Sequence, residues 1–245
     1  MKTISELRVK LFADGADLAE MVALASRPYI RGFTTNPTLM HKAGVRDYRQ
    51  FGRNVVARIT DRPISFEVFS DEFNEMERQA REIGTWGRYV YVKIPVTSTR
   101  GEPSYDLIRR LSHSGVQINV TAVMTLDQVE RAADALAGGA PSNVSVFAGR
   151  IADTGRDPVP LMTKALDLLK AAPSAELIWA SPRELLNILQ ADTIGCHIIT
   201  ITADILKKLD LIGKDLAEFS LDTVKMFRDD ALKAGLTLSE EKART

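Results

Sequence analysis

Lys93 lies in the middle of an apolar run that is typical of a fully buried strand, Tyr89-Val-Tyr-Val-Lys93-Ile-Pro95-Val. Burying an ammonium group without a partner costs free energy, so Lys93 is expected to be ion-paired or held partly neutral. A neutral amine is a nucleophile that can form a Schiff base with a carbonyl substrate. Lys93 is therefore the first candidate catalytic residue.

Two carboxylates fall at the ends of other strand-like runs and could serve such a lysine. Asp14 closes the run Lys10–Asp14, and Glu67 lies in the run Ile64–Phe69. A carbinolamine must lose water to become an imine, and a carboxyl group can move the protons. In the alternative interpretation, Lys93 forms a buried ion pair with one of them that only stabilises the fold. Asp17 is a further acid, but it more simply caps the next helix.

Eight β-rich runs alternate along the chain with segments of helical spacing or charge, and their starts are about 20–30 residues apart, the size of one strand-plus-helix unit. The predicted strands are Lys10–Asp14, Gly32–Asn36, Ile64–Phe69, Val90–Pro95, Gln117–Val123, Asn143–Ala148, Leu177–Ala180 and Ile198–Thr202. This alternation predicts an α/β fold with a parallel sheet, and the length suits a (β/α)8 TIM barrel. An open doubly wound sheet is less favoured, because no Gly-x-Gly-x-x-Gly follows the first strand.

The segments between the strands are predicted helices: Leu18–Ser26, Tyr48–Arg58, Phe73–Gly84, Ser104–Ser114, Leu126–Ala137, Pro158–Ala171 and Pro182–Ala191. Ser70 and Thr125 are N-cap candidates, and Gly115 and Gly138 stand where helices should end. A further amphipathic helix is predicted at about 213–235, beyond the eighth strand. It could pack on its own barrel or on a neighbouring subunit. We expect one barrel domain over residues 1–245 that includes this extra C-terminal helix.

The active site of such a barrel forms at the C-terminal ends of the strands. Polar residues close the predicted strands: Asp14, Asn36, Glu67, Lys93, Asn119, Thr121, Ser145, Arg150, Ser181 and Thr202. Any one of them could be a structural cap, since loops need polar residues. Together they supply a lysine, two acids and several amides and hydroxyls at one end of the barrel.

Composition excludes several other classes of protein. The formal net charge is +0, which argues against a nucleic-acid-binding surface. No uncharged apolar run of about 18 residues occurs, and the first residues do not resemble a signal peptide. We expect a cytoplasmic protein that binds neither nucleic acid nor membrane.

Metal and thiol chemistry are not expected. Cys196 is the one cysteine, so there is neither an internal disulfide nor a cysteine-cluster metal site. It directly precedes an apolar strand and is interpreted as an inert buried thiol. His41, His113 and His197 have no ligand spacing to one another, so we predict no bound metal.

Short motifs on five of the predicted strands resemble the transaldolase family, in the short-chain branch that also contains the fructose 6-phosphate aldolases. They are Phe12-Ala-Asp14, Phe33-Thr-Thr-Asn36-Pro-Thr-Leu39, Val92-Lys93-Ile-Pro95, Ile118-Asn119-Val-Thr121 and Ser145-Val-Phe147-Ala-Gly-Arg150-Ile. The combination of Thr-Asn-Pro with Val-Lys-Ile-Pro is specific. The resemblance implies a (β/α)8 fold, a class I Schiff-base mechanism, and no metal or organic cofactor.

The resemblance also implies a role for each matching residue. Lys93 would form the Schiff base, and Asp14 would move the C4 hydroxyl proton while the C3–C4 bond breaks. Glu67 and Thr121 would hold a water for dehydration and hydrolysis of the imine. The other residues would bind substrate: the dihydroxyacetone moiety by Asn36, Asn119 and Ser145, and the phosphate by Arg150.

Two positions separate the branches of this family. Where its aldolases have Gln and Tyr, its transaldolases resemble this chain, which has Glu67 and Phe147. A tyrosine hydroxyl would help to release the enamine as free dihydroxyacetone. An apolar Phe147 would leave the enamine unprotonated until an acceptor aldehyde arrives.

The seventh strand departs from the family pattern of Ala-Ser-Phe followed by Lys or Arg, which serves the phosphate. The run here is Leu177-Ile178-Trp179-Ala180-Ser181-Pro182-Arg183, and we expect Ile178 and Ala180 to replace the hydroxyl and the cation. Either Ser181 or Arg183 takes over, or the distal group is held less strongly or is not an ordinary phosphate. Trp179 could line the pocket or fill the layer between barrel and helices.

The predicted function is a transaldolase that moves a dihydroxyacetone unit between small-molecule sugar phosphates and works as a homo-oligomer. The alternatives are a class I aldolase that releases free dihydroxyacetone, a relative acting on a modified sugar, and a catalytically silent sugar-phosphate binder. A silent binder would be expected to have lost Lys93 or Asp14, and both are present.

Overall fold

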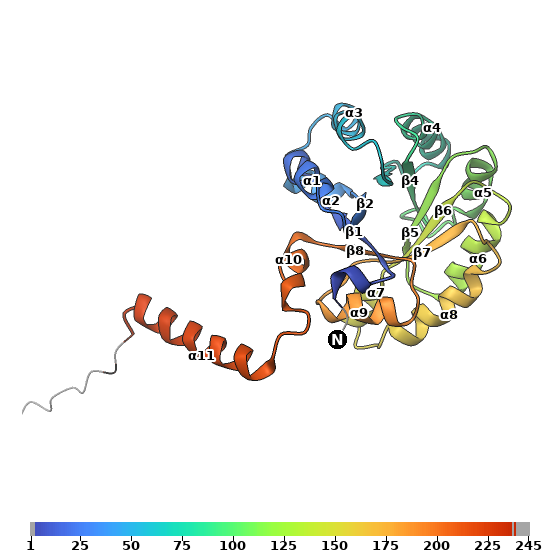
Figure 1. The fold of residues 1–245 in the computed structure, drawn as a ribbon. Coiled ribbons are helices and arrows are strands. Elements are labelled where there is room, and N and C mark those ends of the chain that lie inside the picture. Colours follow the sequence, from blue (N-terminus) through green and yellow to red (C-terminus); the bar gives the residue numbers. More distant parts are fainter. Residues whose placement is uncertain (1–2, 237, 239–245) are drawn as a thin grey trace, which may run out of the picture.

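The computed structural model describes residues 3–236 and 238, and within them eight parallel strands close into a barrel (Figure 1). Each strand pairs with the next in sequence, and the last pairs with the first. The strands are β1 (Lys10–Asp14), β2 (Ile30–Thr34), β3 (Ile64–Glu67), β4 (Val90–Pro95), β5 (Ile118–Val123), β6 (Ser142–Val146), β7 (Ala175–Trp179) and β8 (Ile198–Ile201). The predicted (β/α)8 fold is confirmed.

Helices follow the strands, and all but the last, α11, lie around the barrel (Figure 1). They are α1 (Leu18–Ala25), α2 (Pro37–Lys42), α3 (Tyr48–Arg58), α4 (Phe73–Gly84), α5 (Tyr105–His113), α6 (Leu126–Leu136), α7 (Ala148–Asp153), α8 (Val159–Leu169), α9 (Leu186–Thr193), α10 (Ala203–Leu206) and α11 (Leu216–Lys233). Two 3-10 turns, Ile4–Glu6 and Leu209–Leu211, are also present. The outer helices are amphipathic, so that α5, for example, buries Leu107, Ile108 and Leu111.

Local sequence explains most of the helix ends. Asp17 caps α1 by accepting a hydrogen bond from the Glu20 amide, as its spacing predicted. Thr125 and Gln128 form a capping box at the start of α6. Gly115 and Gly138 both have positive φ values just after helices, a conformation that favours glycine.

Two helix starts differ from the prediction. Ser70 is not the N-cap of α4, because Glu72 occupies that position, although the Ser70 hydroxyl accepts a hydrogen bond from the Glu72 amide. The helix predicted from Pro182 begins only at Leu186. The Asn187 side chain accepts hydrogen bonds from the amides of Arg183 and Glu184, and this holds the preceding residues in a turn.

Apolar side chains form two separate clusters. The main cluster fills the layer between the sheet and the helices and includes Val92 and Ile94. A second, smaller cluster contains Phe12, Ile178, Ala180 and Ile198, with Phe147 packed against it. Phe12 alternates with residues of the main cluster and shares the strand face of Asp14, so this second cluster lies on the lumen side of β1, β7 and β8.

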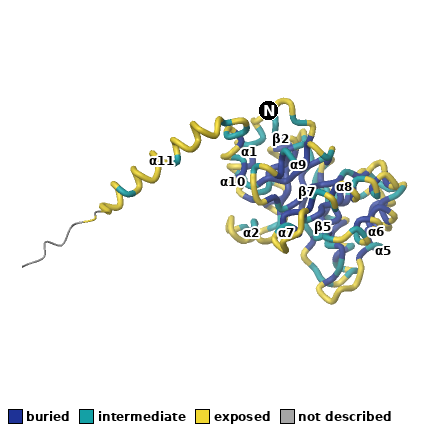
Figure 2. The backbone as a smooth tube through the Cα atoms, turned by 90° about the horizontal axis from the view of Figure 1, so that it is seen from below, coloured by how far each residue is buried: buried dark blue, intermediate teal, exposed yellow. Residues whose placement is uncertain are grey.

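Helix α11 extends away from the barrel (Figures 1 and 2). None of its residues is buried, and the side chains of Leu216, Phe219, Val224 and Phe227 are exposed. The structure therefore excludes one of the two positions that the sequence allowed, packing on its own barrel.

Candidate active site

Lys93 lies on β4 with only 6% of its surface exposed. Its Nζ atom is 3.1 Å from Oε2 of Glu67, the residue beside it in the register of β3 and β4. Nζ also donates a hydrogen bond of 2.9 Å to the carbonyl oxygen of Thr35, which follows β2. Three consecutive strands therefore meet at this amine, and the ion pair expected for a buried lysine is present.

Asp14 at the end of β1 supplies the second carboxylate. Its Oδ1 accepts a hydrogen bond of 2.9 Å from the hydroxyl of Thr34. Burial raises the pKa of Asp14 above its ordinary value, while the charge of Lys93 and the Thr34 hydrogen bond act in the opposite direction. Because Lys93 and Glu67 both influence this pKa, the three ionisable groups belong to one electrostatic cluster.

A chain of hydrogen bonds fixes the amide next to Lys93. Asn119 stands beside Lys93 in the register of β4 and β5. Its Oδ1 accepts a bond of 2.7 Å from the Ser145 hydroxyl, and its Nδ2 donates one of 3.0 Å to the Ser65 hydroxyl. The chain crosses β3, β5 and β6, so the orientation of the Asn119 amide is set before any substrate binds.

Thr121 lies at an irregularity of β5. The pairing of β5 with β6 shifts between Val120 and Val123, and Ala122 has a positive φ of 62°. Such a bulge turns a side chain out of the regular alternation. The Thr121 hydroxyl is buried and has no hydrogen-bond partner among the described residues, so it is suited to bind a small polar molecule.

Phe147 and Arg150 follow β6. Phe147 stands at the N-cap of α7 and packs against the lumen cluster of Phe12, Ile178, Ala180 and Ile198. The guanidinium carbon of Arg150 lies 5.3 Å from the centre of the Phe147 ring. Arg150 is exposed, so its cation lies at the rim of the lumen, above an apolar wall.

Ser181 and Arg183 follow β7. Ser181 has a positive φ of 60°, and the Arg183 side chain forms a bidentate ion pair with Asp153 at the end of α7. Ile178 and Ala180 are buried in the lumen cluster. Trp179 is fully buried in the main cluster, so it fills the layer between barrel and helices rather than a pocket.

Asn36 has a structural contact of its own. Its Oδ1 accepts a hydrogen bond of 2.9 Å from the Leu39 amide and thereby caps α2. The prediction of a strand that ends at Asn36 is wrong, because β2 ends at Thr34. The side-chain Nδ2 is the group of Asn36 that could reach a substrate.

Several residues of the cluster were missed by the sequence analysis. Thr34, Thr35 and Ser65 contact Asp14, Lys93 and Asn119. The Tyr48 hydroxyl donates a bond of 2.8 Å to the carbonyl oxygen of Glu67. Thr34 and Thr35 lie in the family motif that begins at Phe33, and Ser65 lies on a predicted strand two residues before Glu67, but neither fact indicated their contacts.

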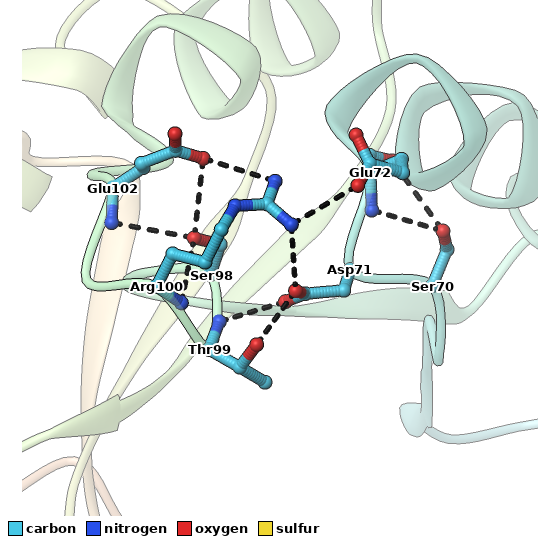
Figure 3. A network of polar contacts seen from close by, with 7 residues as sticks. All are labelled: Ser70, Asp71, Glu72, Ser98, Thr99, Arg100 and Glu102. Carbon is cyan, nitrogen blue, oxygen red and sulfur yellow. Dashed lines mark hydrogen bonds and ion pairs between the residues drawn. The ribbon is translucent and has the colours of Figure 1, made fainter.

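A polar network joins the loops that follow β3 and β4 (Figure 3). The Arg100 side chain contacts Asp71 at 3.2 Å, Glu72 at 3.0 Å and Glu102 at 3.2 Å. Asp71 also accepts hydrogen bonds from the amide and hydroxyl of Thr99. These loops follow β3 and β4, which carry Glu67 and Lys93. The network therefore links the two strands whose side chains form the Lys93–Glu67 ion pair.

The chain is similar to known proteins over most of its length. Residues 11–242 match the family model described as transaldolase/fructose-6-phosphate aldolase. The chain belongs to that family. A probable transaldolase of Dehalococcoides mccartyi is 32% identical over 218 residues, which cover 87% of this chain and 97% of the relative. A probable transaldolase of a Thermoanaerobacter species is 32% identical over 231 residues, covering 94% and 100%. One of Streptococcus agalactiae is 34% identical over 194 residues, covering 79% and 86%.

The described residues contain neither a candidate metal site nor a candidate membrane span. Within residues 3–236 and 238, no three His, Cys, Asp or Glu side chains are grouped so that they could hold a metal ion. In the same part of the chain, no helix is both long and apolar enough to cross a membrane. Cys196 is buried, and burial raises the pKa of its thiol to about 12.

Proposed function

We propose that the protein is a transaldolase that transfers a dihydroxyacetone unit between sugar phosphates through a Schiff base on Lys93. The observation that carries this proposal is the cluster around Lys93. One buried amine has a carboxylate at 3.1 Å and a second carboxylate, Asp14, in the same electrostatic cluster. A barrel core is stabilised as well by apolar residues, so a buried lysine beside two partly buried carboxylates favours a catalytic role.

The first half of the reaction forms the imine. The amine of Lys93 attacks the C2 carbonyl of a ketose, and the resulting carbinolamine loses water. A water held by Glu67 and the Thr121 hydroxyl carries the protons of this dehydration and of the final hydrolysis. The Thr121 hydroxyl has no hydrogen-bond partner in the part of the chain that the structure describes, and this supports that role.

The second half breaks and remakes a carbon–carbon bond. Asp14 takes the proton of the C4 hydroxyl, the C3–C4 bonding electrons move into the iminium, and an aldose leaves. The remaining enamine attacks the aldehyde carbon of the acceptor, and Asp14 returns a proton to the new hydroxyl. The raised pKa of Asp14 suits a carboxyl group that alternates between its two protonation states.

Binding is divided around the lumen. Asn36, Asn119 and Ser145 hold the dihydroxyacetone moiety, and the oriented Asn119 amide supports this assignment. Arg150, with Ser181 and Arg183 beside it, holds the distal phosphate. Phe147 presents an apolar surface, which keeps the enamine from being protonated before the acceptor binds.

The second candidate is a class I aldolase that releases free dihydroxyacetone, or a relative that acts on a modified sugar. The family includes aldolases. The apolar Ile178 and Ala180 and the Asp153 contact of Arg183 favour a substrate without an ordinary phosphate. Glu67 and Phe147 favour the transferase.

Donor cleavage with and without an acceptor distinguishes these functions. Purified protein is incubated with fructose 6-phosphate alone, with added erythrose 4-phosphate, and with added glyceraldehyde 3-phosphate. A transaldolase consumes the donor only when an acceptor is present and forms a new ketose phosphate. Free dihydroxyacetone at the same rate without acceptor would replace the proposal by the aldolase.

The protein works as a homo-oligomer in which α11 packs on a second copy. The exposed apolar side chains of α11 need cover, and the barrel of the same chain does not provide it. Sugar phosphates are metabolites of the cytoplasm, where we place the protein.

A further inference from the structure

The carboxylate of Asp153 forms an ion pair with the guanidinium group of Arg183. The Arg183 Nε donates a hydrogen bond of 2.9 Å to Oδ1 of Asp153, and its terminal nitrogen contacts Oδ2. This bidentate geometry is also the one with which arginine binds a phosphate. Both side chains are about half exposed, at 47% and 51%, so an anion from solution can reach the pair.

Asp153 also lies near the second cation of the rim. Arg150 precedes it by one turn of α7, a spacing that places both side chains on one side of the helix. Hydrogen bonds from Arg183 hold the pKa of Asp153 below its ordinary value, and the charge of Arg150 acts in the same direction. One carboxylate therefore lies within the field of both candidate phosphate-binding arginines.

Gly149 brings these elements together. Its amide contacts the carbonyl oxygen of Ala180 at 3.3 Å, and a Cβ built on it would lie 1.5 Å from the Ser181 carbonyl oxygen and 3.3 Å from Nε of Arg183. The start of α7 and the turn after β7 are thus in direct backbone contact. Arg183 is held against the residue next to Arg150.

The position of Asp153 is unfavourable for the helix itself. It is the last residue of α7, where the helix dipole favours a cation over an acid. The ion pair with Arg183 offsets this unfavourable interaction with the helix dipole. Asp153 therefore serves the ion pair and does not stabilise α7.

We propose that Asp153 is an internal counter-ion that competes with the anionic end of the substrate for Arg183, and thereby sets how strongly phosphorylated substrates are preferred. This inference rests on the proposed function for the identity of the substrate. Exposed ion pairs are weak, and a phosphate dianion carries more charge than a carboxylate, so exchange of partners at Arg183 is feasible. Arg150, which has no bidentate carboxylate partner among the described residues and contacts the Phe147 ring, binds the anion throughout.

The test is the binding of fructose 6-phosphate and of unphosphorylated fructose, measured by calorimetry at constant ionic strength. Asp153→Asn keeps the size of the side chain and removes its charge. We expect the dissociation constant of fructose 6-phosphate to fall by about two- to fivefold, the range of an exposed ion pair, while that of fructose stays unchanged. Asp167→Asn is the matched control, because Asp167 on α8 forms an exposed ion pair with Lys170, the C-cap of that helix.

A double-mutant cycle shows whether Asp153 acts through Arg183. In an Arg183→Ala background, Asp153→Asn should no longer tighten binding of the phosphorylated sugar. The proposal is overturned if Asp153→Asn leaves the affinity for fructose 6-phosphate unchanged or weakens it. It is also overturned if Asp153→Asn still increases that affinity in the Arg183→Ala background, or if neither the native protein nor Asp153→Asn binds fructose 6-phosphate.

Binding by calorimetry requires no turnover. Failure of the proposed function would instead appear as the absence of a covalent adduct on Lys93. The two failures can therefore be told apart.

Discussion

Lys93 shares the lumen with two carboxylates of different character. Glu67 is in direct contact with its ammonium group, whereas Asp14 is hydrogen-bonded to Thr34 and has a raised pKa. Two acids in unequal environments are suited to different proton transfers. On this difference we base the proposal that Glu67 serves the imine steps and Asp14 the carbon–carbon step.

Asp14→Asn should separate these steps. The variant should still form a borohydride-trapped adduct with a ketose but lose turnover by about 10² to 10⁴, the usual effect of removing a positioned acid or base. Asp17→Ala is the control, because Asp17 caps α1 and loss of that cap should cost stability rather than activity. Loss of trapping in Asp14→Asn would assign imine formation to Asp14 instead.

The raised pKa of Asp14 also predicts a pH dependence. Asp14 must be ionised to accept the C4 hydroxyl proton, so kcat/KM should fall on the acid side at a pH above the ordinary range of an aspartate. Between the ordinary and the raised pKa the folded protein binds more protons than the unfolded chain. The contribution of Asp14 to stability therefore decreases as the pH rises through that window. Both predictions are checked by measuring kcat/KM and thermal stability as functions of pH. In Asp14→Asn, the acid-side fall of the residual kcat/KM and the decrease of stability with rising pH should both be absent.

Sequence could suggest members of the proposed site but not their contacts. Lys93 stands out as a lysine inside an apolar run, and Asp14 and Glu67 lie at the ends of strands, which meet at one end of a barrel. Thr34, Thr35 and Ser65 were not identified, since their contacts depend on the register between neighbouring strands. Asp153 was missed because it ends a short helix that carries no periodic signal.

At the scale of elements, the backbone contact at Gly149 fixes α7 against the turn after β7. Gly149→Ala should force the two apart, because its Cβ would lie 1.5 Å from the Ser181 carbonyl oxygen. We expect a loss of about 1–3 kcal/mol in the free energy of unfolding and a raised KM for phosphorylated sugars. Gly15→Ala is the stability control, since its Cβ would meet nothing within 4 Å. Equal midpoints of thermal unfolding for Gly149→Ala and Gly15→Ala would contradict the claim that α7 and the turn after β7 are in close backbone contact at Gly149.

The periodic elements were predictable, and the irregular ones were not. α3 and α4 have the predicted ends, because each begins and ends in a sharp change of pattern. The sequence does not predict the short helices α2 and α7, because six residues are too few to show a helical period. The bulge at Ala122 has no signal either, since alanine rarely adopts a positive φ.

At the scale of the whole molecule, we propose one barrel domain and an extension, α11, that belongs to an assembly. Phe227→Glu should weaken that assembly, because a charge would be placed on the apolar side of α11. Lys225→Glu is the control, since residues two apart on a helix face different directions. Sedimentation velocity should give a multiple of 27.1 kDa for the native chain and for the control. A native protein that sediments as a monomer would contradict the assembly.

The closed barrel was predictable because strand and helix alternate evenly through the chain. The position of α11 was not predictable, because its amphipathic pattern shows only that one side of the helix needs a cover and not which chain provides it. The Asp215 cap at the start of α11 is a local interaction and does not fix the direction of the helix relative to the barrel.

The most direct test of the whole account is borohydride reduction in the presence of fructose 6-phosphate, followed by mass mapping of the modified lysine. The account predicts a dihydroxyacetone-derived adduct on Lys93, absent from Lys93→Ala. Lys10→Ala is the matched control, because Lys10 is also a barrel lysine paired with a carboxylate, that of Glu176, and should not affect trapping. An adduct on another lysine, or activity that survives in Lys93→Ala, would contradict the account.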